Sequence, residues 1–151
     1  MNSPLPTAIA DDSAFDELCW AVAADPASYI KALPFLQAAR RSIRSWAIAD
    51  RDGWKLEDRR LRRIRFFIFV CQAYEASRGC RAGITWNRVN ESSPVGGDFF
   101  EFAKRLHDLL LPPDLRSAND VALAKSIERT LSRRTADPLP KNKAGRKRLA
   151  R

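Results

Sequence analysis

Apolar residues recur at helical spacing along most of the chain, which predicts an all-α fold. We expect Ser13 to cap a first helix, because its hydroxyl can accept hydrogen bonds from backbone N–H groups. Asp25 and Pro26 are expected to end this helix and to start the next, since Asp caps helices and Pro suits a first turn. Pro34 is expected to interrupt that second helix, because proline lacks an N–H donor and clashes with the preceding turn.

The middle of the chain has the two most regular apolar stripes. The first predicts a helix over residues 35–49, followed by a turn at residues 50–53. The second predicts a helix over residues 56–77 that ends at Gly79. Its FFIFV segment is apolar on every side, which suits the centre of a core. Phe, Ile and Val also favour strands, but the helical period of the flanking residues favours a helix.

The second half of the chain is predicted to contain one extended stretch and two further helices. Residues 81–97 lack a helical period, and residues 83–86 are expected to form a short strand or an extended loop. A helix is predicted over residues 98–110, with Asp98 in a capping pattern at its start. The last apolar stripe predicts a helix that ends near residue 134.

Together these elements predict a compact orthogonal bundle of five or six helices with one extended loop or short strand insertion. We expect a flexible N-terminus over residues 1–12, a single helical domain over 13–134 and a disordered basic C-terminal tail over 135–151.

No apolar segment approaches the roughly 20 residues that span a bilayer. The first 20 residues hold four acids and no basic signal-peptide start. We therefore expect a cytoplasmic protein.

The positive charge of the chain is concentrated in two segments. The 151 residues include 27 Lys and Arg against 18 Asp and Glu, which gives a formal net charge of +9. Residues 40–65 hold ten Lys or Arg and four Asp or Glu, and residues 133–151 hold eight and one. The rest of the chain is therefore net negative. A basic surface on such a framework attracts polyanions and displaces their counterions.

The arginines of residues 40–65 are expected to form one patch if the two helices of this segment pack antiparallel. Arginine presents a planar fork that suits phosphate or carboxylate groups. Trp54 can stack on a base if it is exposed, whereas Trp46 falls on the apolar stripe and is expected in the core. The tail can be a flexible arm that reaches phosphates, a targeting signal or a solubilising end. The predicted binding residues are Arg41, Arg44, Arg59, Arg62, Arg63, Arg146, Lys147 and Arg148.

These features predict a small non-enzymatic accessory or regulatory protein that contacts nucleic-acid phosphates with little sequence preference. The alternative is a protein–protein interaction module, such as an inhibitor, adaptor or secreted effector, whose arginines dock an acidic partner surface. A third possibility is a solvated arginine face that acids such as Glu57 and Asp58 neutralise. Phe66 and Phe100 lie off the main apolar stripes and are expected to be exposed or to contact a partner.

Residues that commonly perform catalysis or bind metals are few and scattered. Cys19, Cys71 and Cys80 form no C-x-x-C pair, so we expect free thiols in a reducing compartment. The single histidine, His107, is expected on the polar side of its helix, where positive neighbours oppose its protonation. We therefore expect no catalytic residue, no metal site and no cofactor.

Overall fold

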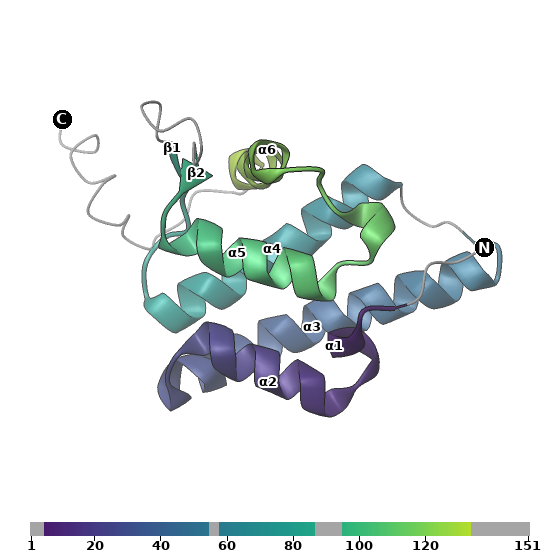
Figure 1. Ribbon diagram of the computed structural model, residues 1–151, viewed down its shortest axis with the longest axis horizontal. Coiled ribbons are helices and arrows are strands. Elements are labelled where there is room, and N and C mark those ends of the chain that lie inside the picture. Colours follow the sequence, from purple (N-terminus) through teal and green to yellow (C-terminus); the bar gives the residue numbers. More distant parts are fainter. Residues whose placement is uncertain (1–4, 55–57, 87–94, 134–151) are drawn as a thin grey trace.

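The computed structural model describes residues 5–54, 58–86 and 95–133. The predicted disordered tail lies outside these residues. The part of the chain that is described forms a bundle of six α-helices with a short 3₁₀ helix and a two-stranded antiparallel sheet, which confirms the predicted fold class (Figure 1). In chain order the elements are α1 (Thr7–Ala10), α2 (Asp12–Ala23), α3 (Pro26–Arg51), α4 (Arg59–Arg78), β1 (Thr85–Trp86), β2 (Val95–Gly96), α5 (Asp98–Leu110), η1 (Pro113–Leu115) and α6 (Asp120–Ser132).

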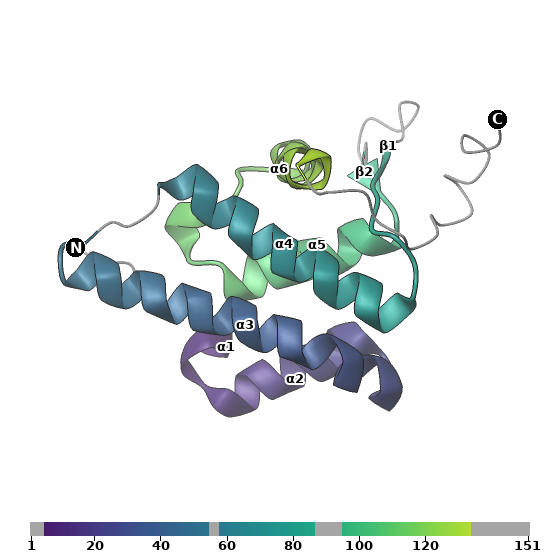
Figure 2. The same cartoon turned by 180° about the vertical axis from the view of Figure 1, so that it is seen from behind.

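Helix α4 lies at the centre of the bundle. It packs against α3 on one side and against α5 and α6 on the others, and α1 and α2 cover the far side of α3. Figures 1 and 2 both show α6 end-on, so it crosses over α4 and α5. Phe66, Phe67 and Val70 of the FFIFV segment are buried. The prediction that this segment is helical and central is therefore confirmed.

Helix α3 is one continuous helix of 26 residues, so the predicted interruption at Pro34 is wrong. Asp25 caps the helix as predicted, because its side chain accepts a hydrogen bond from the Ser28 N–H at 2.9 Å. Pro34 removes the N–H that would bond to the carbonyl of residue 30. Ile30 is 68 % exposed, so water can reach this part of the helix. Packing of the residues on both sides of Pro34 keeps the helix intact.

The packed fold begins earlier than the expected boundary at residue 13. Ile9 of α1 is fully buried, although residues 1–12 were expected to be flexible. Asp11 caps α2 in place of Ser13, because its Oδ1 accepts hydrogen bonds from the N–H groups of Ser13 at 2.8 Å and Ala14 at 3.2 Å. The cap and the buried isoleucine tie this segment to the bundle.

The connection after α4 contains the only strands among the described residues. Gly79 ends α4 as predicted, with a positive φ of 71° that favours glycine. Thr85 pairs with Gly96 and Trp86 with Val95, so the predicted extended stretch forms half of a small antiparallel sheet.

The two phenylalanines expected at the surface are in the core. Phe66 is 1 % exposed and Phe100 is 0 % exposed, so their predicted exposure is wrong. The physical reason is that α4 and α5 are each covered on more than one side, which makes their buried faces wider than a single apolar stripe.

Candidate nucleic-acid interface

The second half of α3 has one side buried against the bundle and one side exposed to solvent. Ile43 and Trp46 are buried against the bundle, as expected for Trp46. Arg41, Arg44 and Ile48 recur at the spacing that places side chains on one side of a helix. All three are exposed, and they define the outer face of α3.

The end of α3 fixes the position of Trp54. Gly53 has a φ of +85°, and its N–H donates to the carbonyl of Asp50 at 3.1 Å. The Trp54 N–H donates to the carbonyl of Ala49 at 2.6 Å. These two bonds form a Schellman motif, which commonly brings the residue after the glycine against the last turn of the helix. The sequence therefore places an indole beside the outer face of α3.

A shallow surface hollow combines arginines with this apolar patch. Its volume is about 600 Å³. Trp54 is 68 % exposed and Ile48 is 50 % exposed, so the hollow is open to solvent. We call this feature the α3 hollow. It is lined by Arg41, Arg44, Ser45, Ile48, Ala49 and Trp54.

The two arginines of the α3 hollow differ in how far the fold neutralises them. Within the described part of the chain, the Arg41 side chain forms no hydrogen bond or ion pair. The Arg44 Nε donates to the Ile9 carbonyl at 3.1 Å, and its Nη2 lies 3.8 Å from an Asp12 carboxylate oxygen. The Arg44 side chain is still 44 % exposed. Both guanidinium groups can therefore meet a ligand in the hollow.

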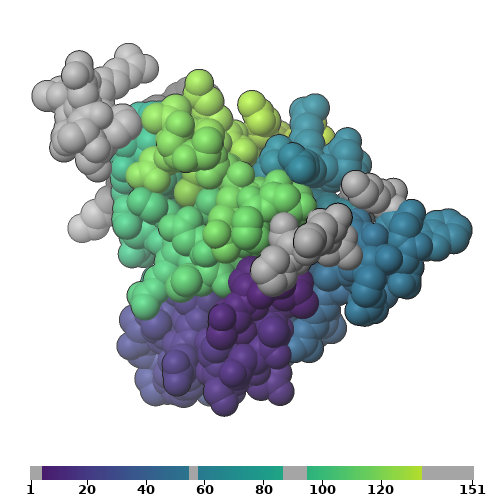
Figure 3. All heavy atoms as spheres, turned by 45° about the vertical axis from the view of Figure 1, so that its right-hand side comes forward, coloured from purple at the N-terminus to yellow at the C-terminus, as the bar shows by residue number. Residues whose placement is uncertain are grey.

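Further cations surround the junction of α3 and α4. Figure 3 shows the end of α3 and the start of α4, in shades of blue, projecting from one side of the molecule. Arg59 and Arg60 are exposed at the start of α4. Arg51 is also exposed, with its Nε 3.9 Å from the carboxylate of the neighbouring Asp52. The projecting end is therefore rich in accessible guanidinium groups.

Arg62 does not belong to this surface, and the prediction that it joins an exposed patch is wrong. It is 5 % exposed, and its Nη1 and Nη2 donate to the two oxygens of Asp50 at 2.7 and 2.9 Å. Its guanidinium carbon also lies 5.7 Å from the centre of the Trp46 ring. Asp50 follows Trp46 by four residues, so it continues the inward stripe of α3 and meets α4 there.

The other predicted residues are distributed over different parts of the molecule. Arg63 is half-buried and lies one turn before Phe67, whose ring is stacked on His107. Arg59 lies one turn earlier on α4 and is exposed. The helices do pack antiparallel, but the five predicted arginines do not form one continuous patch. Arg146, Lys147 and Arg148 lie outside the described residues.

His107 is buried, so its predicted place on the polar side of α5 is wrong. It is 3 % exposed, and its Nε2 accepts a hydrogen bond from the Ser117 N–H at 2.9 Å. Its Nδ1 therefore carries the proton and donates to Asp108 at 2.8 Å. Burial lowers the pKa of His107, Arg116 and Arg63 act in the same direction, and Asp108 opposes them. This neutral imidazole holds the connection between α5 and α6.

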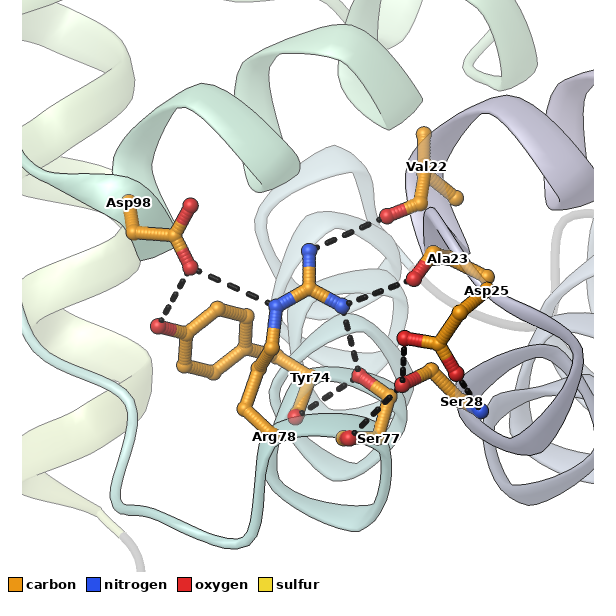
Figure 4. A network of polar contacts seen from close by, with 8 residues as sticks. All are labelled: Val22, Ala23, Asp25, Ser28, Tyr74, Ser77, Arg78 and Asp98. Carbon is orange, nitrogen blue, oxygen red and sulfur yellow. Dashed lines mark hydrogen bonds and ion pairs between the residues drawn. The ribbon is translucent and has the colours of Figure 1, made fainter.

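Arg78 makes several polar contacts that could not be foreseen from the sequence, and these contacts connect α4 to neighbouring helices (Figure 4). Its guanidinium donates to the carbonyls of Val22 at 3.1 Å and Ala23 at 3.2 Å, at the end of α2. Its Nε lies 3.4 Å from a carboxylate oxygen of Asp98, which also accepts from the Tyr74 hydroxyl at 2.9 Å. Asp98 therefore binds α4. Its predicted capping of α5 is wrong, because no side chain makes a cap hydrogen bond at the start of that helix.

The cysteines and acids of the described ranges form no metal-binding cluster. No three His, Cys, Asp or Glu side chains there are placed to hold a metal ion. The three cysteines are free, and burial raises the pKa of the Cys19 thiol to about 12. None of the helices there combines the length and the hydropathy needed to cross a membrane.

Comparison with models of known protein families, with curated proteins and with solved structures finds no match to the chain. The inference of function therefore rests on the geometry and charge of the chain itself. The features that bear on it are the α3 hollow and the exposed arginines beside it.

Proposed function

We propose that the protein is a non-enzymatic accessory or regulatory factor that binds nucleic-acid phosphates through the outer face of α3. The observation that carries the proposal is the pairing of Arg41 and Arg44 one turn apart in the α3 hollow. Arg41 makes no ion pair with any described acid, and Arg44 remains 44 % exposed. Two accessible guanidinium groups on one helix face form a phosphate-binding surface.

The charge distribution supports a polyanion as the ligand. Exposed Arg59 and Arg60 extend the positive surface beyond α3, and the sequence adds the basic residues 133–151. We include Arg146, Lys147 and Arg148 as a second set of phosphate contacts. Binding of a polyanion to such a surface gains free energy from counterion release. Phosphate contacts carry no sequence information, so we expect little preference among nucleic-acid sequences.

The experiment is a salt titration of binding to a fluorescein-labelled 20-base-pair DNA duplex, followed by fluorescence anisotropy with the full chain. The test variant is the double substitution Arg41→Gln/Arg44→Gln. The matched control is Arg105→Gln/Arg129→Gln, which removes the same charge from exposed positions on α5 and α6. Each lost phosphate contact lowers the slope of log affinity against log salt by about 0.9. We expect a loss of about 1.8 for the test variant and little change for the control.

A second variant separates binding from folding. Arg44 also holds the Ile9 carbonyl, so its loss can disturb α1. Arg41→Gln alone leaves that contact intact and should lower the slope by about 0.9. Arg62 is left unchanged because it is buried and paired with Asp50. Equal slopes for the wild type, Arg41→Gln and both double variants would overturn the proposal.

The second candidate function is docking of an acidic protein surface on the same face. The observation that favours it is the apolar part of the α3 hollow, since Ile48 and Trp54 beside arginines also suit a protein partner. A pull-down from native lysate, with and without nuclease, separates the two functions. A partner that survives nuclease treatment and is lost with Arg41→Gln would support protein docking and contradict the nucleic-acid proposal.

A further inference from the structure

Trp54 helps to end α3 through its backbone N–H, but its indole side chain remains largely exposed to solvent. Its backbone is fixed by the Schellman motif, and its indole lies against the last turn of α3. Yet 68 % of the residue remains exposed, next to Ile48 at 50 %. Large exposed apolar side chains that adjoin one another commonly mark a binding site. The face of this indole is available to a ligand.

The other tryptophans of the chain are engaged within the fold. The Trp20 ring is stacked on Tyr29, with ring centres 4.2 Å apart and planes 8° apart. The Trp86 Nε1 donates to Glu128 at 2.7 Å, and Trp46 is buried. Trp54 has no such ring or side-chain partner among the described residues. Trp54 is also the most exposed of the four tryptophans, so its indole is the best placed to accept a flat ligand.

We propose, resting on the proposed function, that the α3 hollow stacks an unpaired base and that the preferred ligand is single-stranded nucleic acid. Among the residues that line the hollow, Ile48 and Ala49 supply apolar surface, the Trp54 indole supplies a stacking surface, and Arg41 and Arg44 supply positive charge. An unpaired nucleotide offers the complement, a flat apolar face joined to phosphates. The hollow has a volume of about 600 Å³ and is open to solvent, so a base can reach the indole from outside.

Single strands are favoured over duplexes for a geometric reason. In a duplex the faces of the bases are stacked on one another, and only phosphates and groove edges remain accessible. A duplex can therefore use Arg41 and Arg44 but not the face of Trp54. A single strand can use all three, because its bases can leave their stack without breaking pairs. The difference in affinity between the two ligands should therefore depend on the indole.

The test measures affinity for labelled oligo-dT of 20 nucleotides and for a labelled duplex of the same length, with the full chain. The variants are Trp54→Ala and Trp54→Phe, and Trp86→Phe is the matched control at another exposed tryptophan. Base–aromatic stacking corresponds to about a 5- to 150-fold change in affinity per base. We expect Trp54→Ala to lose single-strand affinity by a factor in that range and to keep duplex affinity. Trp54→Phe should retain most of the preference, and Trp86→Phe all of it.

The possible failures of this inference and of the proposed function are distinguishable. If Trp54→Ala changes neither affinity while Arg41→Gln weakens both, the stacking inference is overturned and phosphate binding stands. If Trp54→Ala weakens both ligands equally, the single-strand preference does not come from stacking and the inference is also overturned. If the wild type binds neither ligand, the proposed function itself fails.

Discussion

Replacing Arg78 with methionine would measure how strongly one side chain ties α2 to the centre of the bundle. The substitution removes two hydrogen bonds from a charged donor to the Val22 and Ala23 carbonyls. Such bonds contribute about 1.5–3 kcal/mol each, and we take the lower value because the side chain is 23 % exposed. The ion pair with the exposed Asp98 adds little, and the methionine sulfur can replace the guanidinium that lies 5.5 Å from the centre of the Phe102 ring. The expected loss of unfolding free energy is about 3 kcal/mol.

The assay is urea unfolding followed by circular dichroism at pH 7, with Arg129→Met as the control. Arg129 is exposed on α6, and its replacement should change the unfolding free energy by less than about 0.5 kcal/mol. A loss below about 1 kcal/mol for Arg78→Met, with an unchanged dependence on urea, would refute the reasoning. It would show that water replaces the guanidinium at the end of α2 at almost no cost.

Three further predictions concern the pH dependence, the core and the end of α3. Burial lowers the pKa of His107 in the folded state, so His107 takes up a proton at higher pH in the unfolded chain than in the folded one. The free energy of unfolding should therefore fall as the pH drops below about 6.5. Urea unfolding at pH 7.5 and pH 5 would show this fall, and the part due to His107 should disappear in His107→Phe. Phe100→Ala should lower the unfolding free energy by about 3–5 kcal/mol, a loss that no exposed phenylalanine would give. Gly53→Ala places a side chain at a φ of +85° and should cost about 1 kcal/mol in thermal unfolding, while shifting the fluorescence of Trp54.

The helices could be predicted from the sequence because burial repeats with the period of the helix. The central helix α4 and its end at Gly79 follow from a regular stripe and a single glycine. Pro34 was misjudged because its local cost is outweighed by core packing on both sides, which no local pattern reveals. The sequence of a segment shows its preference for helix or turn, but tertiary packing can override that preference.

The candidate site could be predicted only in part, because the sequence shows charges but not their partners. Arg41 and Arg44 remain accessible, whereas Arg62 is paired with Asp50 inside the helix junction. The sequence did hold a sign of this pairing, because Asp50 follows Trp46 by four residues and so continues the buried stripe of α3. A half-buried acid at that position is stabilised by a cationic partner from the facing helix.

The burial of His107 also could not be predicted from the sequence alone. His107 shares a helix face with Phe100 and Ala103 at spacings of seven and four residues. Once Phe100 is known to be in the core, the burial of His107 follows. The sequence alone leaves the width of the buried face open, because it depends on how many elements cover α5.

The most direct test of nucleic-acid binding by the outer face of α3 is an NMR titration of the full ¹⁵N-labelled chain with oligo-dT. The chain has four tryptophans, whose indole N–H signals can be assigned with single Trp→Phe variants. We predict that the Trp54 indole and the backbone amides of Arg41, Arg44 and Ile48 shift most. Shifts concentrated around Trp20 or Trp86, with the Trp54 signal unmoved, would contradict binding at the α3 hollow.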